Sequence, residues 1–99
     1  MYYAQLTPGE LERLAKLAEE CAEVIQVIGK IMVHGYASGH PKRPEQGNNR
    51  QHLEEELGHV EYLTRLMCSR GDVNADKIWE SHQEKSETIG KYLHHQEGL

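Results

Sequence analysis

Apolar residues recur at steps of three and four along the first third of the chain. The row consists of Leu11, Leu14, Ala18, Cys21, Ile25, Ile28 and Met32. Because an α-helix turns once every 3.6 residues, this spacing keeps the side chains on one face and predicts a helix with that face inward. Thr7 can cap its start, with Pro8 in the first position and Glu10 completing a capping box. Gly35 is expected to end it.

A second apolar row runs beside the first. It consists of Leu17, Val24, Val27 and Ile31. The two rows together cover about half of the helix circumference, which is more than one partner helix needs. The excess predicts a four-helix-bundle-type core completed by oligomerisation, as a homodimer or homotetramer.

Residues 35–49 read as a loop, because Pro41, Pro44 and three glycines would interrupt a helix or a central strand. Asn48 or Asn49 can cap a second helix that ends near Gly71, and Asn74 can cap a third. The second stripe is Leu53, Leu57, Val60, Leu63 and Met67, and the third is Ile78, Ile89 and Tyr92, with Trp79 and Leu93 at its edges. With no strand pattern or internal repeat, residues 1–99 are predicted to form one all-α domain, a helical hairpin plus a third helix.

Composition excludes several classes of partner. The net charge of -5 and the scattered lysines and arginines argue against binding to nucleic acid. No apolar run approaches the roughly 20 residues that span a bilayer, so no membrane partner is expected. Cys21 and Cys68 stand outside any CxxC pair, and MYYAQLTPGE lacks the basic and apolar parts of a signal peptide. These features predict a reducing, intracellular and cytoplasmic location.

Charged side chains stand on the predicted apolar faces. Glu56 projects between Val60 and Leu63, with His59 beside it, whereas the other acids of the second helix point away and are expected to be solvated. Those other acids are Glu54, Glu55 and Glu61. Lys85 falls in the middle of the third stripe. An unpaired buried charge costs several kcal/mol, so charges on all three helices predict one shared polar centre.

Two pairs of side chains, in each of which the members lie one helical turn apart, are candidates for a metal site. Glu20 lies at the margin of the first apolar arc, and Glu23 lies one turn further along, facing away from the main stripe. Glu56 and His59 lie on the second helix. On facing helices, these four side chains could bind one divalent cation. Because carboxylates dominate, Mg²⁺ or Mn²⁺ is favoured over Zn²⁺.

The same motifs resemble those of the MazG-like nucleotide pyrophosphohydrolases, in the all-α NTP pyrophosphatase superfamily, and especially their short phage-type members. The family pattern is EExxE followed by ExxD on the next helix. Here the motifs stand as Glu19-Glu20-Cys21-Ala22-Glu23 and Glu56-Leu57-Gly58-His59, and the resemblance extends over residues 14–96. His59 replaces the family's aspartate. It could bind the metal through a ring nitrogen, with some preference for Mn²⁺, or the three glutamates could suffice with water.

The resemblance implies hydrolysis of a nucleoside triphosphate, in particular a purine deoxynucleotide such as dGTP or dATP, to the monophosphate and pyrophosphate. Glu19 or Glu23 would orient or deprotonate the attacking water, and Lys85 would hold the phosphates. Lys30 and His82 are further candidates for substrate binding, and the loop from 34 to 50 would lie near the base. It also implies a phage-encoded protein acting in the cytoplasm of a bacterial host.

Two other functions fit part of the pattern. A Glu-x-x-His pair also belongs to di-iron carboxylate bundles, which need two such motifs and two further glutamate helices. This chain has one, Glu56 with His59, so dimerisation would have to supply the second. The other alternative is a catalytically silent binding module, in which Glu20 pairs with Lys85 and His59 marks the loss of the site.

Overall fold

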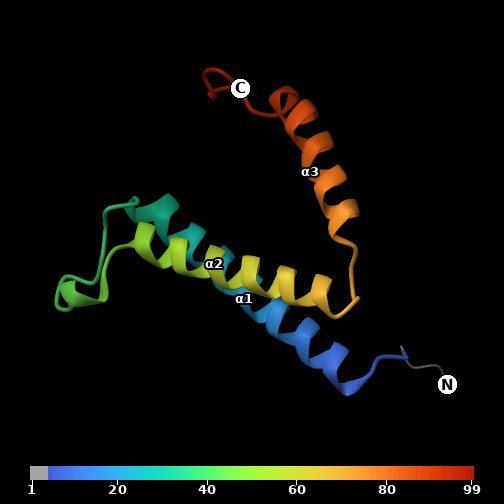
Figure 1. The fold of residues 1–99 in the computed structure, drawn as a ribbon. Coiled ribbons are helices and arrows are strands. Elements are labelled where there is room, and N and C mark those ends of the chain that lie inside the picture. The colour runs from blue at the N-terminus through green and yellow to red at the C-terminus, as the bar shows by residue number, and fades with distance from the viewer. Residues whose placement is uncertain (1–4) are drawn as a thin grey trace.

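Three α-helices make up most of residues 5–99, the part of the chain that the computed structural model describes (Figure 1). They are α1 (Pro8–His34), α2 (Asn49–Ser69) and α3 (Ala75–Thr88), with short 3-10 helices η1 (Pro44–Gln46) and η2 (Ile89–Lys91). Residues 1–4, which open the stretch searched for a signal peptide, lie outside the described residues. No strand forms within residues 5–99, which confirms the all-α prediction. None of the helices described is long and apolar enough to cross a membrane.

The helix ends confirm the capping predictions. The Thr7 hydroxyl accepts a hydrogen bond from the Glu10 N–H at 3.1 Å, while the Glu10 carboxylate accepts one from the Thr7 N–H at 2.9 Å. Asn48 forms the same reciprocal box with Gln51 at the start of α2. Asn74 caps α3 by accepting from the Lys77 N–H at 3.1 Å. Each helix therefore begins where its local sequence satisfies the first free backbone N–H groups.

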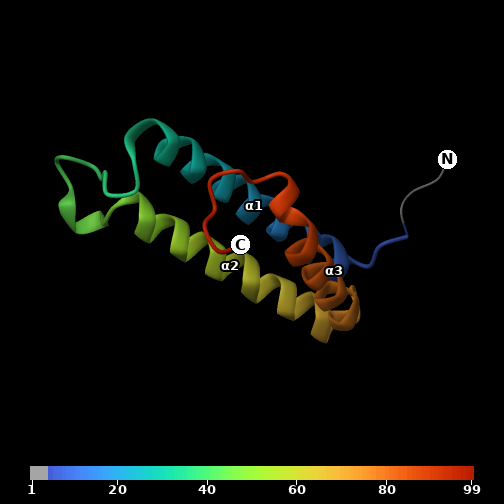
Figure 2. The same ribbon diagram turned by 90° about the horizontal axis from the view of Figure 1, so that it is seen from above.

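Helices α1 and α2 form an antiparallel hairpin and lie side by side along their length (Figure 2). Its buried apolar residues are Val27, Leu63 and Met67. The loop between the helices closes one end, where the Asn49 side-chain amide donates to the Gly35 carbonyl at 3.1 Å.

A paired charge closes the other end of the hairpin. Arg13 on α1 donates to both carboxylate oxygens of Asp72, from Nε at 2.6 Å and from Nη2 at 2.9 Å. Asp72 lies in the turn between α2 and α3, so the pair joins residues 59 positions apart in sequence. Two parallel charge-assisted bonds of this kind fix orientation as well as distance.

The face of α1 that turns inward is not the predicted one. All seven residues of the first apolar row, from Leu11 to Met32, are exposed, and we call this row the outer stripe. The second row faces α2 instead, with Val27 buried and Leu17, Val24 and Ile31 half-buried. Both rows are apolar, so hydrophobicity alone does not choose between them. Glu20 lies on the same side of α1 as the second row, and it contacts His59 of α2.

Helix α3 stands apart from the hairpin. It continues directly into η2, hardly touches α1 or α2, and contains no buried residue (Figure 1). The prediction that Lys85 points into a core is therefore wrong, since its side chain is exposed. A three-helix core does not form within one chain.

We expect the hairpin core to be sensitive to truncation at Leu63. Leu63 is 8% exposed, whereas its neighbour Tyr62 is 64% exposed. Leu63→Ala should lower the free energy of unfolding by about 2–5 kcal/mol, because it leaves a cavity between the helices. Tyr62→Ala, which also removes a large side chain, should change it by no more than about 0.5 kcal/mol. Urea denaturation measures both, and equal losses would contradict the observed helix register.

Candidate metal centre

Three potential ligands meet midway along the hairpin. Glu20 comes from α1, and Glu56 and His59 come from α2, where a spacing of three residues puts them on the same side. One ligand atom from each residue lies within 4.8 Å of the other two. Glu20 is 6% exposed, Glu56 is half-buried and His59 is exposed, so the cluster reaches from the helix interface to the surface.

The imidazole of His59 lies between the two carboxylates. Its Nδ1 is 3.1 Å from Glu20 Oε2 and 3.4 Å from Glu56 Oε2. Lys16 Nζ approaches Glu20 from the preceding turn, 3.6 Å from Oε1. The cluster therefore places two carboxylates, those of Glu20 and Glu56, beside two basic groups, the His59 ring and the Lys16 amine.

One carboxylate oxygen of the cluster lacks a hydrogen bond. Glu56 Oε2 is buried and has no hydrogen-bond partner, although His59 Nδ1 lies 3.4 Å away. A buried acceptor without a donor is costly. The site would therefore gain from a cation or a proton at this oxygen.

The protonation of the cluster reflects the crowding of its charges. Proximity to the Glu20 carboxylate raises the pKa of Glu56 to about 7, with burial and Glu23 acting in the same direction. Hydrogen bonding with Glu56 lowers the pKa of Glu20, helped by His59, and Glu20 in turn raises the pKa of His59. Both raised pKa values favour protonation, which neutralises the Glu56 carboxylate and places positive charge on the His59 ring beside Glu20.

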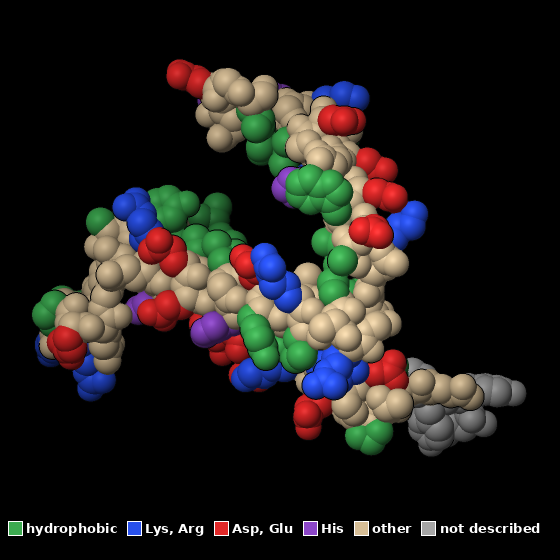
Figure 3. Space-filling view, viewed as in Figure 1, with side chains coloured by type: hydrophobic (Ala, Val, Ile, Leu, Met, Phe, Trp, Pro, Cys, Tyr) green, Lys and Arg blue, Asp and Glu red, His purple; other side chains and the backbone are tan. Residues whose placement is uncertain are grey.

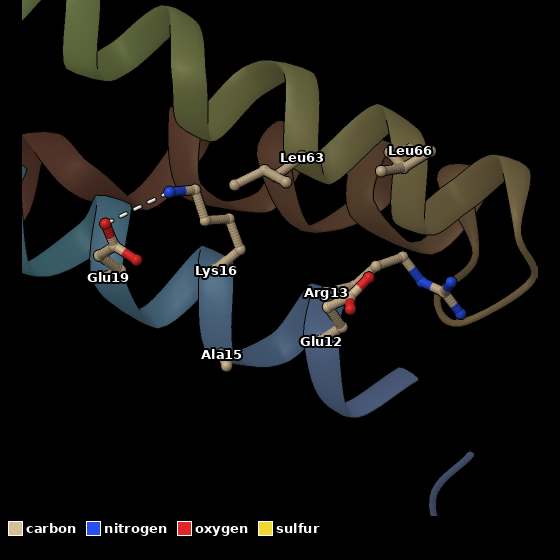
Figure 4. A pocket seen from close by; sticks show the side chains of 7 residues that line it. All are labelled: Glu12, Arg13, Ala15, Lys16, Glu19, Leu63 and Leu66. Carbon is tan, nitrogen blue, oxygen red and sulfur yellow. Dashed lines mark hydrogen bonds and ion pairs between the residues drawn. The ribbon is translucent and has the colours of Figure 1, made fainter. Parts of the chain in front are cut away.

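Two hollows flank the cluster on the same side of the hairpin. The first, of about 460 Å³, is lined by Glu20, His59 and Tyr62, and the second, of about 350 Å³, by Glu19 and Arg13 among others. Lys16 and Leu63 line both. Figure 4 shows the second hollow, in which the Lys16 side chain points towards Glu19 beside Leu63. The Lys16 ammonium is 3.2 Å from the Glu19 carboxylate. An anion in either hollow would meet Lys16.

Lys16 was missed by the sequence analysis. Its signal was its position four residues before Glu20, which puts both side chains on one side of α1.

The other predicted ligands and catalytic residues lie near the cluster without being part of it. Glu23 is half-buried one turn beyond Glu20 and is close enough to raise the pKa of Glu56, yet it is not within the group of three. Glu19 is exposed and paired with Lys16. Glu54, Glu55 and Glu61 are exposed, as expected for solvated acids.

The predicted substrate-binding residues are not brought to the cluster. His82 stacks on Trp79 of α3, with ring centres 4.8 Å apart, and Lys85 and Lys30 are exposed. Among residues 5–99, no hydrogen bond or ion pair links these three to Glu20, Glu56 or His59. Glu20 pairs with Lys16 and His59 rather than with Lys85.

Comparison with protein families, with characterised proteins and with solved structures gives no match to this chain.

The cluster should make the metal-free protein less stable as pH rises. The folded-state pKa of Glu56, about 7, lies above its ordinary value of 4.5. Its contribution to stability is thus complete below about pH 4.5 and is lost as pH rises through about 7. The raised pKa of His59 acts in the same direction, while the lowered pKa of Glu20 matters only in acid. In EDTA, the melting temperature should fall between about pH 5.5 and about pH 8.

Glu56→Gln tests the origin of this fall, because glutamine does not titrate. The variant should lose most of the pH dependence, whereas Glu54→Gln, an exposed acid two residues earlier, should keep it. A melting temperature that rises over this range in the native protein would contradict the crowding of charges.

Proposed function

We propose that Glu20, Glu56 and His59 bind a divalent cation and that the chain is a metal-dependent nucleoside triphosphate pyrophosphohydrolase. The observation that carries the proposal is the meeting of the two glutamate motifs across the hairpin, with a buried carboxylate oxygen left without a partner. Acids on a solvated surface would not leave an oxygen without a partner, because water would donate hydrogen bonds to it.

The donor set favours Mg²⁺ or Mn²⁺. Two carboxylates and one imidazole lie within 4.8 Å of one another, and the adjoining hollow leaves room for water or phosphate oxygens as further ligands. Carboxylates suit both ions, and the imidazole shifts the preference towards Mn²⁺. Glu23 could join as a fourth ligand or act on water.

The surrounding residues suit hydrolysis of the bridge between the α and β phosphates. A bound cation would neutralise the triphosphate and polarise the phosphorus under attack. Glu23 is the better placed of the two predicted bases, because it is half-buried and close enough to Glu56 to raise its pKa, whereas Glu19 is exposed. Glu23 takes the proton of the attacking water. The water oxygen bonds to phosphorus as the bond to the bridging oxygen breaks, and pyrophosphate and the monophosphate leave.

Lys16 is the cation positioned to hold the phosphates. Its ammonium group lies at the edge of both hollows and needs only to exchange Glu19 for a phosphate oxygen. This role was expected of Lys85, which lies on α3 outside the cluster. A purine deoxynucleotide such as dGTP or dATP remains the substrate proposed from the family resemblance.

A silent binding module is the competing function, and the position of His59 favours it. The His59 ring lies between Glu20 and Glu56, and when it is protonated it provides the positive charge that a metal ion would otherwise provide. The di-iron alternative has less support, because the chain places one Glu-x-x-His pair at the cluster.

Metal-dependent melting and pyrophosphate release test the proposal together. Mn²⁺ at 100 times its dissociation constant should stabilise the native protein by about 2.7 kcal/mol, and dGTP or dATP should release pyrophosphate. Glu56→Gln should abolish both effects while leaving the apo protein as stable or more stable, because it removes a crowded charge. Glu54→Gln is the matched control and should change neither. If Glu56→Gln keeps the metal shift and the turnover, the metal-site assignment is wrong. A native protein with neither response supports the silent module.

Replacing His59 by the family's residue tests its role as a ligand. His59→Asp should preserve activity and move the preferred ion from Mn²⁺ towards Mg²⁺, because a carboxylate is the harder ligand. Rates in each metal, measured beside melting temperatures, provide the comparison. Lower stability with an unchanged ion preference would mean that His59 only neutralises its acidic neighbours.

A further inference from the structure

The hollow drawn in Figure 4 has a different chemical character at each end. Lys16 lies at the end nearest the metal cluster, and Glu12 and Arg13 lie at the other end. Between the two ends, Leu63 and Leu66 of α2 form an apolar wall. A ligand that fits this space is therefore anionic where it meets Lys16, apolar in its middle and able to form hydrogen bonds at its far end.

The charged side chains of this hollow follow one ridge of α1. Glu12, Lys16 and Glu19 are separated by four and then three residues, so they project from the same side of the helix. Glu12 precedes the metal-site residue Glu20 by eight residues, which is about 12 Å along the helix axis. That length is close to the reach of a nucleotide from its α phosphate to the far edge of its base.

The two hollows beside the cluster form one surface, because they share Lys16 and Leu63. Figure 3 shows acidic, basic and histidine side chains, with hydrophobic ones among them, along the edge of the hairpin that turns away from α3. Residues 34–50, which the family resemblance places near the base, line neither hollow. A nucleotide whose phosphates bind at the cluster would instead meet Leu63 and Leu66 with its base.

The far end of the hollow is fixed to the hairpin. Arg13 borders it and is held by Asp72 through two hydrogen bonds. Glu12 precedes Arg13 in the first turns of α1, whose start is fixed by the capping box of Thr7 and Glu10. A binding group on such a scaffold loses little freedom when a ligand binds, which favours selectivity.

The carboxylate of Glu12 is suited to one base in particular. Glu12 is exposed and borders the hollow, so its carboxylate can reach a ligand there. A carboxylate only accepts hydrogen bonds, and its two oxygens suit two donors side by side. Among the common bases, guanine alone presents two adjacent donors, its N1–H and its 2-amino group. Adenine and cytosine have a ring acceptor beside the amino group, and thymine flanks its N–H with carbonyl oxygens.

We infer that the hollow between Lys16 and Glu12 is the base subsite and that Glu12 selects guanine, so that dGTP rather than dATP is the substrate. The inference rests on the proposed function, because the cluster and Lys16 must hold the phosphates. The base packs against Leu63 and Leu66, and its N1–H and 2-amino groups donate to the Glu12 carboxylate.

Pyrophosphate release and nucleotide binding test the inference on the full chain. With Mn²⁺, kcat/KM for dGTP should exceed that for dATP by about 10-fold or more, as expected for one bidentate contact. The α,β-methylene analogues of dGTP and dATP are not cleaved at this bridge, and they should show the same preference in calorimetric binding.

A matched pair of variants locates the selecting group. Glu12→Gln should abolish the preference for guanine or reverse it, because an amide offers one acceptor and one donor and so also suits adenine. Glu54→Gln is the control and should keep the preference, since Glu54 is an exposed acid that lines neither hollow.

The possible outcomes separate the base subsite from the proposed hydrolysis. Equal turnover of dGTP and dATP, or a preference for dGTP that Glu12→Gln retains, would overturn the inference and leave the hydrolase standing. Guanine-selective binding that Glu12→Gln abolishes, without any pyrophosphate release, would support the base subsite and overturn the hydrolase. Binding of neither analogue would overturn both.

Leu66→Ala tests whether the base lies against the apolar wall. The variant should bind both analogues about 5-fold more weakly, because methylene groups are lost from the contact with the base. The preference for guanine should stay. Inorganic tripolyphosphate, which has no base, should bind the variant and the native protein equally. Circular dichroism checks the fold of Leu66→Ala, and Glu12→Gln probes the same hollow from an exposed position. Equal weakening of tripolyphosphate and of both analogues would overturn the placement of the base.

Discussion

Glu20 and Glu56 approach each other inside the packed face of the α1–α2 hairpin, and much of the structure depends on how their charges are balanced. Both carboxylates have lost water, and the Glu20 carboxylate makes Glu56 harder to ionise. The protein compensates with His59 and Lys16 from adjacent turns and with a proton that Glu56 keeps to about pH 7. A core as small as Val27, Leu63 and Met67 has little free energy to spare for unbalanced charge. The free-energy cost of burying these two carboxylates is consistent with a role in binding a ligand.

The parts of the fold that could be predicted from sequence are those determined locally. Thr7, Asn48 and Asn74 begin their helices as expected, because a cap requires only a side chain within three residues of a free N–H. Which face of α1 turns inward was predicted wrongly, because both of its apolar rows have helical spacing. That choice depends on where α2 lies, which is a property of the pair and not of either helix.

The candidate site was predictable to a similar extent. Glu20, Glu56 and His59 were grouped because each stands at the edge of, or within, an apolar face, and the structure brings them together. Lys85 was grouped with them on the same argument, but α3 does not pack against the hairpin, so its apolar face indicates nothing about the cluster. Lys16 escaped notice because a lysine beside glutamates on an exposed turn is usually only a surface ion pair.

The ion pair between Arg13 and Asp72 determines which end of the hairpin opens first. At the loop end the helices are joined by the chain itself, whereas at the other end a noncovalent pair holds them. Its side chains retain some exposure, so salt and denaturant weaken that end first. Local opening thus begins at the start of α1 and proceeds along the hairpin towards the cluster, leaving the loop end as the last contact. Amide hydrogens in the first turns of α1 would then exchange before those near Val27, so protection should increase along a single helix.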